Sequence, residues 1–423
     1  MTPASPPPPA AQDTHDVVIV GGGLVGASLA IALDRIGLDV GLVEATPAAE
    51  LPAVFDERNL SFAEATVTAL TALGVMQKLG APTGAIERIH VSRQGDFGRS
   101  VLHAHDYDRS EFGRVVVARD FGQALEARLG ELTRLRRYRP VRFTGVADDG
   151  LARHRVLRVA GDGGERLLQT RLLVAADGSH SAVRQALGIE TDRDEYGHTL
   201  FVTRLRTERA PDGTAYERLT DHGPTALLPR GDRHFGLVHG VDEAAAGAVA
   251  AMDDAAFLAH AQRSFGWRVG RFLSCGTRNA YPAARVLARR LVAPRAVLVG
   301  NAAQTIHPIG AQGFNLGLRD ALTLAELIAD GRGHGGDGDF DYGSADLLAR
   351  YVRRRADDRE RTLAFSDGLA RLGSNPTSLA RPLRGVGLFA LDRLPTVQSW
   401  LVGGALGYRG RVPALCRAQG ASP

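Results

Sequence analysis

The stretch DVVIVGGGLVGASLAIALDRIGLDVGLVE, residues 16–44, changes its hydrophobic pattern twice. The apolar, β-branched run at residues 16–20 predicts a buried strand, and the three glycines that follow predict a tight turn. Small and apolar residues then recur with helical spacing up to Gly37, before a second apolar run at residues 40–44. The stretch therefore predicts a βαβ unit, which begins an α/β domain with a parallel sheet.

The glycine turn of this unit has the spacing of a dinucleotide-binding loop. In GGGLVG, Gly21 allows the sharp turn, Gly23 lets the backbone approach a pyrophosphate, and Gly26 lets the helix pack closely on the strand. Glu44 ends the second strand about 20 residues later, where a carboxylate commonly binds ribose hydroxyls. Glycines often serve tight turns alone, but this context favours a dinucleotide, with NAD and FAD both open.

The composition excludes several classes of protein. The chain has 423 residues, 44% of them hydrophobic, and its net charge of +4 is too small for a nucleic-acid coat. Cys275 and Cys416 lie far apart, and no Cys or His spacing predicts a metal site or a disulfide scaffold. Because neither a secretory signal nor a membrane-length apolar run is present, we expect a cytoplasmic protein. Residues 1–13 are rich in proline and predict a disordered leader.

The rest of the chain predicts further elements. Ser61 and Glu64 match a capping box, which predicts a helix that begins at Ser61. Residues 171–176 form another buried strand, and residues 196–281 alternate as in a mostly antiparallel sheet. Residues 313–330 have an apolar helical stripe, and the charged run RRRADDRER, residues 353–361, predicts a solvated helix face.

The segment GNAAQTIHPIGAQGFNLGLRDALTLAEL, residues 300–327, resembles the second flavin motif of the class A flavoprotein aromatic hydroxylases, the group that includes p-hydroxybenzoate hydroxylase. The resemblance implies that Asn301 meets the ribityl or pyrophosphate part of FAD and that residues 308–315 border the isoalloxazine ring. Gly313, Phe314 and Asn315 begin a helix, whose backbone N–H groups could stabilise negative charge on reduced flavin.

Two further motifs resemble the same group. VAADGSHSAVR, residues 174–184, matches a motif assigned to both FAD and NADPH, with Asp177 and Gly178 at the matching positions. FDERNLSFAEAT, residues 55–66, matches the loop that places an arginine beside the flavin, here Arg58. Arg119 and Gln123 match another cofactor contact, although surface positions explain these two residues equally well.

Stretches outside the flavin motifs resemble the ubiquinone-biosynthesis hydroxylases within this group. They include YERLTDHGPTALLP, SFGWRVG and YVRRRADDRER, and the resemblance spans residues 15–367. The chain departs from the family in Asn301, in the order Gly310-Ala311, and in Ser61-Phe62. These departures affect the placement of the ring and substrate rather than FAD binding.

The resemblance implies a division into domains with a p-hydroxybenzoate-hydroxylase-like fold. The Rossmann-type FAD-binding domain would comprise residues 14–87, 114–190 and 281–333. An inserted antiparallel β-sheet substrate domain would comprise residues 88–113 and 191–280, and residues 334–423 would form a helical C-terminal region.

The reaction implied is hydroxylation of a polyprenylated phenol, such as 2-polyprenyl-6-methoxyphenol, in ubiquinone biosynthesis. NADPH or NADH would reduce FAD, and O2 would form a flavin C4a-hydroperoxide that attacks the ring. Loss of the phenolic proton activates the ring, so a proton acceptor helps. The candidate catalytic groups are the Pro308 carbonyl, Arg58 and His222, with Tyr216 and His239 as further candidates that structural roles explain as well.

Alternatives remain at this level. The chain could hydroxylate another phenol, act as a flavin oxidase or dehydrogenase, serve as an FAD-binding assembly subunit of a quinone-synthesis complex, or be a plain NAD-binding protein. The segment at residues 388–406 is amphipathic, which fits peripheral contact with the inner membrane, contact with a partner, or packing on the FAD domain. The sequence leaves the oligomeric state open.

Overall fold

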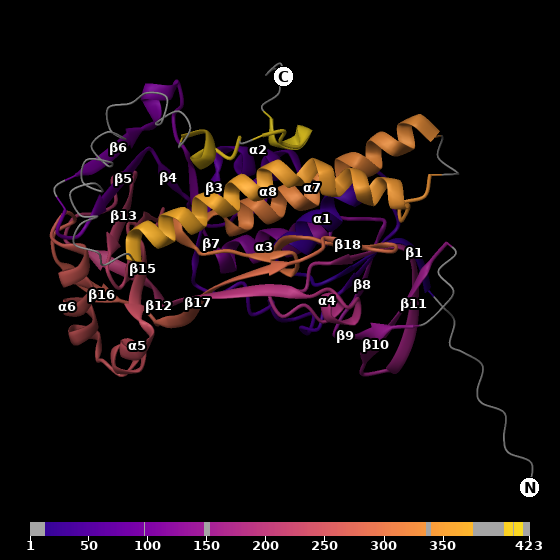
Figure 1. The fold of residues 1–423 in the computed structure, drawn as a ribbon, viewed down its shortest axis with the longest axis horizontal. Coiled ribbons are helices and arrows are strands. Elements are labelled where there is room, and N and C mark those ends of the chain that lie inside the picture. Colours follow the sequence, from indigo (N-terminus) through magenta and orange to yellow (C-terminus); the bar gives the residue numbers. More distant parts are fainter. Residues whose placement is uncertain are drawn as a thin grey trace, which may run out of the picture.

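The computed structural model describes residues 13–96, 98–147, 153–335, 340–374, 402–408 and 410–417. Two sheets lie toward opposite ends of an elongated molecule, and the helices α7 (Gln312–Gly335) and α8 (Ala345–Ser374) run side by side along them (Figure 1). The predicted leader, residues 1–13, lies almost entirely outside the described residues. The predicted α/β class, with a Rossmann-type sheet, a second antiparallel sheet and C-terminal helices, is confirmed.

The first sheet is built on the predicted βαβ unit. Strand β1 (Asp13–Val20) pairs in parallel with β2 (Val40–Val43) on one side and with β11 (Gly164–Ala175) on the other. The parallel order continues through β8 (Leu135–Tyr138) and β19 (Ala296–Leu298). The central strands β1, β2 and β19 and the second half of β11 are largely buried, which explains their nearly continuous apolar sequence, whereas the edge strand β8 is partly exposed. The remaining strands of this sheet are antiparallel: β9 (Val141–Val146), β10 (Arg155–Gly161) and β18 (Val292–Ala293).

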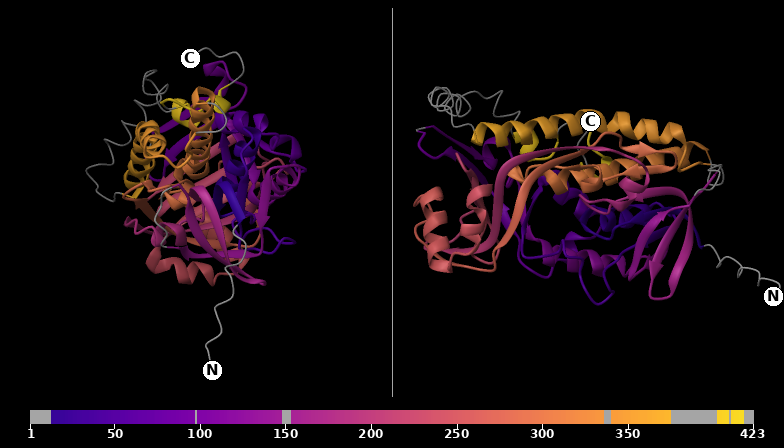
Figure 2. Two further views of the ribbon diagram at one scale, coloured as in Figure 1. Left: turned by 90° about the vertical axis from the view of Figure 1, so that its right-hand side faces the viewer. Right: turned by 60° about the horizontal axis from the view of Figure 1, so that its bottom comes forward.

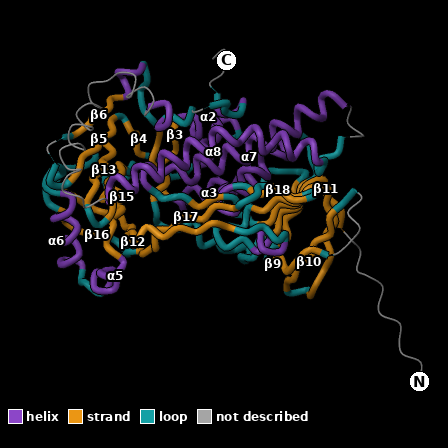
Figure 3. The backbone as a smooth tube through the Cα atoms, in the orientation of Figure 1, coloured by secondary structure: helices purple, strands orange, loops and turns teal. Residues whose placement is uncertain are grey.

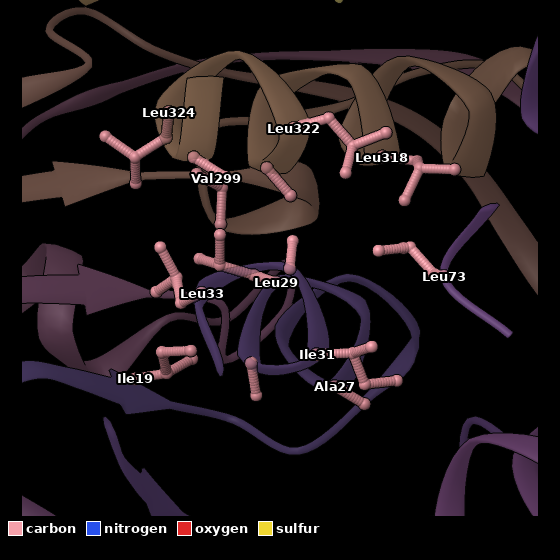
Figure 4. Close-up of a cluster of buried hydrophobic side chains, with 14 of the residues drawn as sticks. Ile19, Ala27, Leu29, Ile31, Leu33, Leu73, Val299, Leu318, Leu322 and Leu324 are labelled. Carbon is pink, nitrogen blue, oxygen red and sulfur yellow. The ribbon is translucent and has the colours of Figure 1, made fainter. Parts of the chain in front are cut away.

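Helices cover both faces of the first sheet. On one face lie α1 (Leu24–Arg35), α3 (Ala118–Leu129) and α7, and on the other lies the short helix α4 (Ala182–Ala186). Figure 4 shows Leu29 and Leu33 of α1 opposite Leu318 and Leu322 of α7, with Val299 between them. This apolar contact fixes α7, and therefore its N-terminus, relative to the glycine turn.

The second sheet carries two different faces. Its strands are β5 (Arg88–Arg93), β6 (Arg99–His103), β12 (Thr191–Thr207), β13 (Thr214–Thr220), β14 (Gly223–Pro229), β15 (Phe235–Asp242), β16 (Phe272–Cys275), β17 (Asn279–Ala288) and β20 (Gln304–Thr305). All pairs are antiparallel except β5 with β13. The helices α5 (Glu243–Ala250) and α6 (Asp254–Phe265) pack on one face at the end of the molecule (Figure 2). The other face turns toward the first sheet.

The long strands β12 and β17 connect the two parts of the molecule. They pair along most of their length and extend from the second sheet toward the first (Figure 3). A third, small sheet lies beside them and contains β3 (Asn59–Ala63), β4 (Gly84–Ile86) and β7 (Gly113–Val117). Single-turn helices complete the connections: η1 (Met76–Lys78), η2 (Ala104–Tyr107), η3 (Gly300–Ala302), η4 (Ile309–Ala311) and η5 (Ala414–Cys416).

The predicted capping box at Ser61 is wrong. Ser61 lies within strand β3, where it pairs with Val115 of β7, and helix α2 (Glu64–Ala72) begins three residues later. The residue before the helix is Ala63, whose methyl side chain cannot accept a capping hydrogen bond from the helix. Backbone groups from elsewhere take this role, because the N–H of Glu64 donates to the carbonyl of Phe112. Pairing with β7 therefore outweighs the local helix signal.

The charged run at residues 353–361 is a solvated face only in part: Arg353, Asp357, Glu360 and Arg361 are exposed, as the sequence predicts, but two other charged residues are not. Arg355 and Asp358 of α8 are buried and form ion pairs with each other and with Asp320 and Arg319 of α7. The four side chains carry two charges of each sign, so the buried cluster is balanced. Burial alone would raise the pKa of Asp358, but the charges of Arg319 and Arg355 outweigh it and lower the pKa to about 2.

The C-terminal segment predicted to be amphipathic lies mostly outside the described residues. At its described end, Val402 and Leu406 pack in a small apolar cluster with Ile86, Leu102 and Phe112. Packing on the folded protein therefore explains this end of the pattern. Among the helices that the structure describes, none is long and apolar enough to cross a membrane.

Replacing Asp358 by Asn should strongly destabilise the protein. The change leaves two buried arginines with one carboxylate, and breaking such a buried pair costs about 3–5 kcal/mol. Chemical unfolding at pH 7 measures the loss. Because the pKa of Asp358 is lowered in the folded state, its stabilisation is present above about pH 4 and fades as the pH falls toward 2, so the gap between wild type and variant should narrow there.

The matched control is Asp357→Asn, because Asp357 is the preceding residue on α8 and is exposed. It should change the unfolding free energy little. Equal effects of the two substitutions would contradict the buried network.

Candidate functional site

A cavity of about 1360 Å³ lies between the first and second sheets. One wall is formed by the carboxyl ends of β1, β2, β11 and β19 with the loops that follow them, and the other wall by the open face of the second sheet. Ligand pockets commonly occupy about 300–1,000 Å³. The cavity therefore has room for a large cofactor and a second molecule.

The glycine turn forms the end of the cavity at β1. Gly21 has a φ of +106°, and a Cβ there would lie 2.5 Å from the carbonyl oxygen of Ala176. A Cβ on Gly26 would lie 1.9 Å from the carbonyl oxygen of Gly21, so this position requires glycine for close packing of α1. Gly21 and Gly23 line the cavity, whereas Gly26 supports the turn from behind.

Glu44 reaches the cavity from the end of β2. Its Oε2 accepts a hydrogen bond from the N–H of Gly22 at 2.8 Å, and its Oε1 accepts one from the N–H of Thr46 at 2.8 Å. These two bonds fix the carboxylate beside the glycine turn. Each oxygen keeps a lone pair, so the group can still accept hydrogen bonds from two ribose hydroxyls.

Asp177 and Gly178 follow β11 and also line the cavity. The Asp177 side chain holds the start of α4, because it accepts hydrogen bonds from the Ser181 hydroxyl at 2.5 Å and the Val183 N–H at 3.1 Å. Gly178 has a φ of +84°, which favours glycine. These residues therefore build a rigid turn at the cavity wall.

Asn301 lines the cavity directly after β19 and its turn. The preceding residue, Gly300, donates its N–H to Asp320 Oδ2 at 3.2 Å, and Gln304 donates to the same oxygen at 2.6 Å. Asp320 also pairs with Arg355. The position of Asn301 is thus set by the buried charge cluster of α7 and α8.

Helix α7 begins at the cavity, as the sequence predicts, and Gly313, Phe314 and Asn315 lie in its first turn. The Asn315 side chain is satisfied within the protein: its Oδ1 accepts from Ala63 N–H and Thr66 Oγ1, and its Nδ2 donates to the carbonyls of Ser61 and Ala311. Any contact of Asn315 with a cofactor therefore comes from its backbone. The Phe314 ring packs against Phe62 and Phe121 at centroid distances of 5.2 and 5.3 Å.

These features fit FAD. A glycine turn at a helix N-terminus suits the pyrophosphate, Glu44 suits the ribose, and the free N–H groups at the start of α7 suit a ring that carries negative charge when reduced. One continuous cavity connects the glycine turn, Glu44 and the start of α7. A nicotinamide dinucleotide would leave the α7 end without a role.

Arg58 lines the cavity where the two sheets meet. It forms a two-point contact with Asp56, with Nε–Oδ1 and Nη2–Oδ2 distances of 2.8 and 2.7 Å, and its Nη2 donates to the Tyr281 hydroxyl at 3.1 Å. Tyr281 belongs to β17 and donates in turn to Asp56 Oδ2 at 2.7 Å. Burial would raise the pKa of Asp56, but hydrogen bonds from Arg58 and Tyr281 lower it. Asp56 therefore stays ionised and holds Arg58 in place.

Arg119 and Gln123 do not line the cavity, although the sequence predicts both as cofactor contacts. Both are exposed on α3, where Arg119 pairs with Glu57 and Asp120. The residues of α3 that face inward are Phe121 and Gly122, and a Cβ on Gly122 would lie 2.5 Å from the Phe55 ring. This placement argues against a direct contact of either predicted residue with the cofactor.

Pro308 lines the cavity at the start of a tight turn. Its carbonyl oxygen, a predicted catalytic group, accepts a hydrogen bond from Ala311 N–H at 2.8 Å. Gly310 and Ala311 have φ angles of +68° and +50°, so the altered Gly-Ala order places an alanine in a conformation that favours glycine. The carbonyl is therefore engaged within its own turn.

Two buried histidines, His307 and His198, support the turn at residues 308–311 through hydrogen bonds. The N–H of Ile309 donates to His307 Nδ1 at 3.1 Å, so the ring proton of His307 lies on Nε2, which meets His198 Nε2 at 2.7 Å. His198 then carries its proton on Nδ1, which faces the Tyr196 carbonyl at 3.2 Å. Burial lowers the pKa of His307 to about 3, so the two histidines stay neutral and each ring keeps the tautomer described above.

The structure places His222 and His239 away from the cavity interior, whereas Tyr216 is among the residues that line the cavity. His222, predicted as catalytic, is 66% exposed and pairs with Asp242, so this placement argues against its catalytic role. His239 is buried against α6, between Thr225 and His260. Tyr216 packs its ring against Phe265 at a centroid distance of 5.6 Å, on the helix-covered side of the sheet.

Sequence reasoning missed Glu217, which lines the cavity on β13. It lies between Ala215 and Leu219, which belong to the same face of the strand and also line the cavity. The signal was present in the pattern, because a charged residue alternates with apolar ones on a face that a strand should bury. Deciding which face borders a cavity requires the pairing of β13 with β5 and β14.

Comparison with known proteins agrees with this geometry. Residues 14–366 match the family described as FAD binding domain. The chain is 34% identical over 410 residues to ubiquinone hydroxylase UbiL of Rhodospirillum rubrum, covering 95% of this chain and 92% of that protein. It is 29% identical over 397 residues to 3-demethoxyubiquinol 3-hydroxylase of Escherichia coli, covering 93% and 98%.

A solved structure shows the same fold. The crystal structure of p-nitrophenol 4-monooxygenase PnpA from Pseudomonas putida superposes with a TM-score of 0.76 at 17% identity, covering 95% of this chain and all of that one. At this identity the likeness concerns the fold alone.

The two predicted arginine contacts should behave differently on substitution. Arg58→Gln should weaken FAD binding by about 10-fold or more, because a charge-assisted hydrogen bond contributes about 1.5–3 kcal/mol. Arg119→Gln, the matched control outside the cavity, should change the affinity less than about 2-fold. Titration of apoprotein with FAD, followed by flavin fluorescence, measures both. An unchanged affinity in Arg58→Gln, or a large loss in Arg119→Gln, would reverse this assignment.

Proposed function

Because the chain belongs to the FAD binding domain family of flavin-dependent monooxygenases, we propose that it hydroxylates a polyprenylated phenol in ubiquinone biosynthesis. NADPH or NADH serves as the reductant and O2 as the co-substrate, and 2-polyprenyl-6-methoxyphenol is the proposed substrate. The names of the UbiL and E. coli relatives support the pathway. The structural feature that best supports a prenylated substrate is the apolar face of the second sheet, which lies opposite the flavin motifs.

This face forms a chamber with few polar groups. Adjacent strands present Leu102, Ile89, Ala215 and Leu228 in one row, which continues beyond the flavin motifs. Ile86, Phe112 and Ala405 extend the apolar lining at that end. Each buried CH₂ group contributes about 0.8 kcal/mol, so a chamber of this kind favours an isoprenoid tail over a bare phenol.

The cofactor and the residues around it have separate roles in the proposed reaction. FAD supplies an electrophilic oxygen atom derived from O2 once it has been reduced. Arg58 and the start of α7 would provide positive charge beside the flavin ring, and the turn at residues 308–311, which lines the same cavity, would border the ring. Binding of an apolar substrate in the cavity would displace water, which would protect a reactive oxygen species from wasteful decay.

Contact with the inner membrane or with a ubiquinone-biosynthesis complex is part of the proposal. A lipophilic substrate resides in the membrane, so a cytoplasmic enzyme would collect it at the surface. The apolar end of the chamber at Ala405 adjoins the C-terminal segment and is the side where the tail would enter.

The main alternatives make different predictions for the same assay. A hydroxylase of another phenol would respond to that phenol, and an oxidase or dehydrogenase would consume reductant without inserting oxygen. An FAD-binding assembly subunit would show no substrate-stimulated oxidation.

The direct test measures NADPH consumption by the FAD-loaded protein with 2-prenyl-6-methoxyphenol, with the tail-less 2-methoxyphenol, and with neither. We expect stimulation by the prenylated phenol and a product heavier by about 16 Da, the mass of one inserted oxygen atom. The tail-less phenol should show a KM at least about 10-fold higher, because it forgoes apolar burial. Reductant consumption without a heavier product, or equal KM values for the two phenols, would contradict the proposal.

A further inference from the structure

Glu217 is the charged side chain in the central row of the chamber face. The register places it beside Val91 of β5 and Ala226 of β14, and Ala226 in turn faces Val238 of β15. The row is therefore apolar on both sides of Glu217. Such a position is costly for a carboxylate unless a partner compensates it.

Within the described part of the chain, one Glu217 oxygen has no partner. Oε1 is buried and lacks a hydrogen bond, and the nearby backbone N–H of Gly310 favours the ionised form of the carboxylate. The side chain retains some accessible surface because it faces the cavity, yet protein encloses it. This loss of water raises the pKa of Glu217 to about 7, although the Gly310 N–H acts in the opposite direction.

Neighbouring charges do not balance Glu217. Arg93 lies on β5 opposite Leu219, and it pairs with Asp221 and with Asp96 at 3.7 Å. From α8, Phe365 lines the cavity, and Asp367 lies 3.6 Å from Arg285. The other charged or histidine lining residues, Glu44, Arg58, Arg142, Asp177 and His180, belong to the first-sheet side. A ligand in the chamber could therefore supply the hydrogen bond that Glu217 lacks.

We propose that Glu217 accepts the hydrogen bond of the substrate phenol and receives its proton during hydroxylation. This rests on the proposed function, because it needs a phenol in the chamber. The proximity of the Gly310 N–H places the carboxylate beside the turn at residues 308–311, which borders the flavin ring in the family resemblance. The carboxylate thus lies between the turn and the chamber, where a phenol can donate a hydrogen bond to it.

Proton transfer to Glu217 accompanies the transfer of oxygen to the phenol ring. The ring carbon bonds to the hydroxyl group delivered by reduced flavin and O2, as the oxygen–oxygen bond breaks and its electrons leave with the flavin. The phenolic O–H bond breaks at the same time, its electron pair enters the ring, and the proton passes to Glu217. The resulting dienone loses the proton on its ring carbon and gains one at its carbonyl oxygen, which gives the hydroxylated phenol. Glu217 releases its proton to solvent, and the oxygen left on the flavin takes up a proton from solvent.

The first test is Glu217→Gln, which keeps the shape and an acceptor for Gly310 but removes the base. Hydroxylation of 2-prenyl-6-methoxyphenol should fall about 100-fold, with FAD affinity unchanged. A ring-fluorinated analogue that is already ionised at the assay pH needs no base and should lose at least 10-fold less. The control Glu195→Gln, at an exposed position of β12, should behave as wild type. Equal losses with both phenols would overturn the proposal.

A second readout does not require turnover. The visible absorbance of 2-prenyl-4-nitrophenol reports its ionisation when it is bound to the protein. A carboxylate beside its hydroxyl opposes ionisation, so the pKa of the bound probe should be at least one unit higher in wild type than in E217Q. Equal values would show that Glu217 does not touch the hydroxyl. Because this measurement needs only binding, it separates failure of the Glu217 assignment from failure of the proposed reaction.

Discussion

The buried carboxylate of Asp320 is the constraint on which the cavity depends. It accepts hydrogen bonds from Gly300 at the end of β19 and from Gln304, and it pairs with Arg355 of α8. It thereby joins the first sheet, α7 and α8 at one point beside the cofactor loop. A Cβ on Gly317 would lie 2.8 Å from Val25, which shows how closely α7 also approaches α1. The start of α7 and the glycine turn are consequently held in a fixed relation.

The second sheet gives the cavity its chemical character because its two faces have different partners. One face packs Phe201, Leu227 and Phe235 against α5 and α6 as an ordinary core. The other face remains open toward the flavin motifs and is apolar apart from Glu217, Arg93 and a few small polar groups. The Asp56–Arg58–Tyr281 contact joins this sheet to the cofactor side. The cofactor side and the proposed substrate side therefore face each other across one cavity.

Local patterns and the family resemblance together located most of the cofactor half of the site, although Arg119 and Gln123 lie outside the cavity. The glycine turn, Glu44, Asp177 and the start of α7 are each defined by a few neighbouring residues, so their places follow from the sequence. The errors involve distant partners. Arg355 and Asp358 look solvated until Asp320 and Arg319 supply the opposite charges, and Ser61 looks like a helix cap until β7 pairs with it. Glu217 was overlooked because only the pairing with β5 and β14 shows that it faces a cavity.

A crystal structure of the protein with FAD and 2-prenyl-6-methoxyphenol tests the central claim most directly, because the claim concerns where two molecules lie in one cavity. The account predicts the flavin ring at residues 308–315, the prenyl tail along Ile89 and Leu228, and the phenolic oxygen within about 3 Å of a Glu217 oxygen. A phenol bound outside the chamber, or one whose hydroxyl turns away from Glu217, would contradict it.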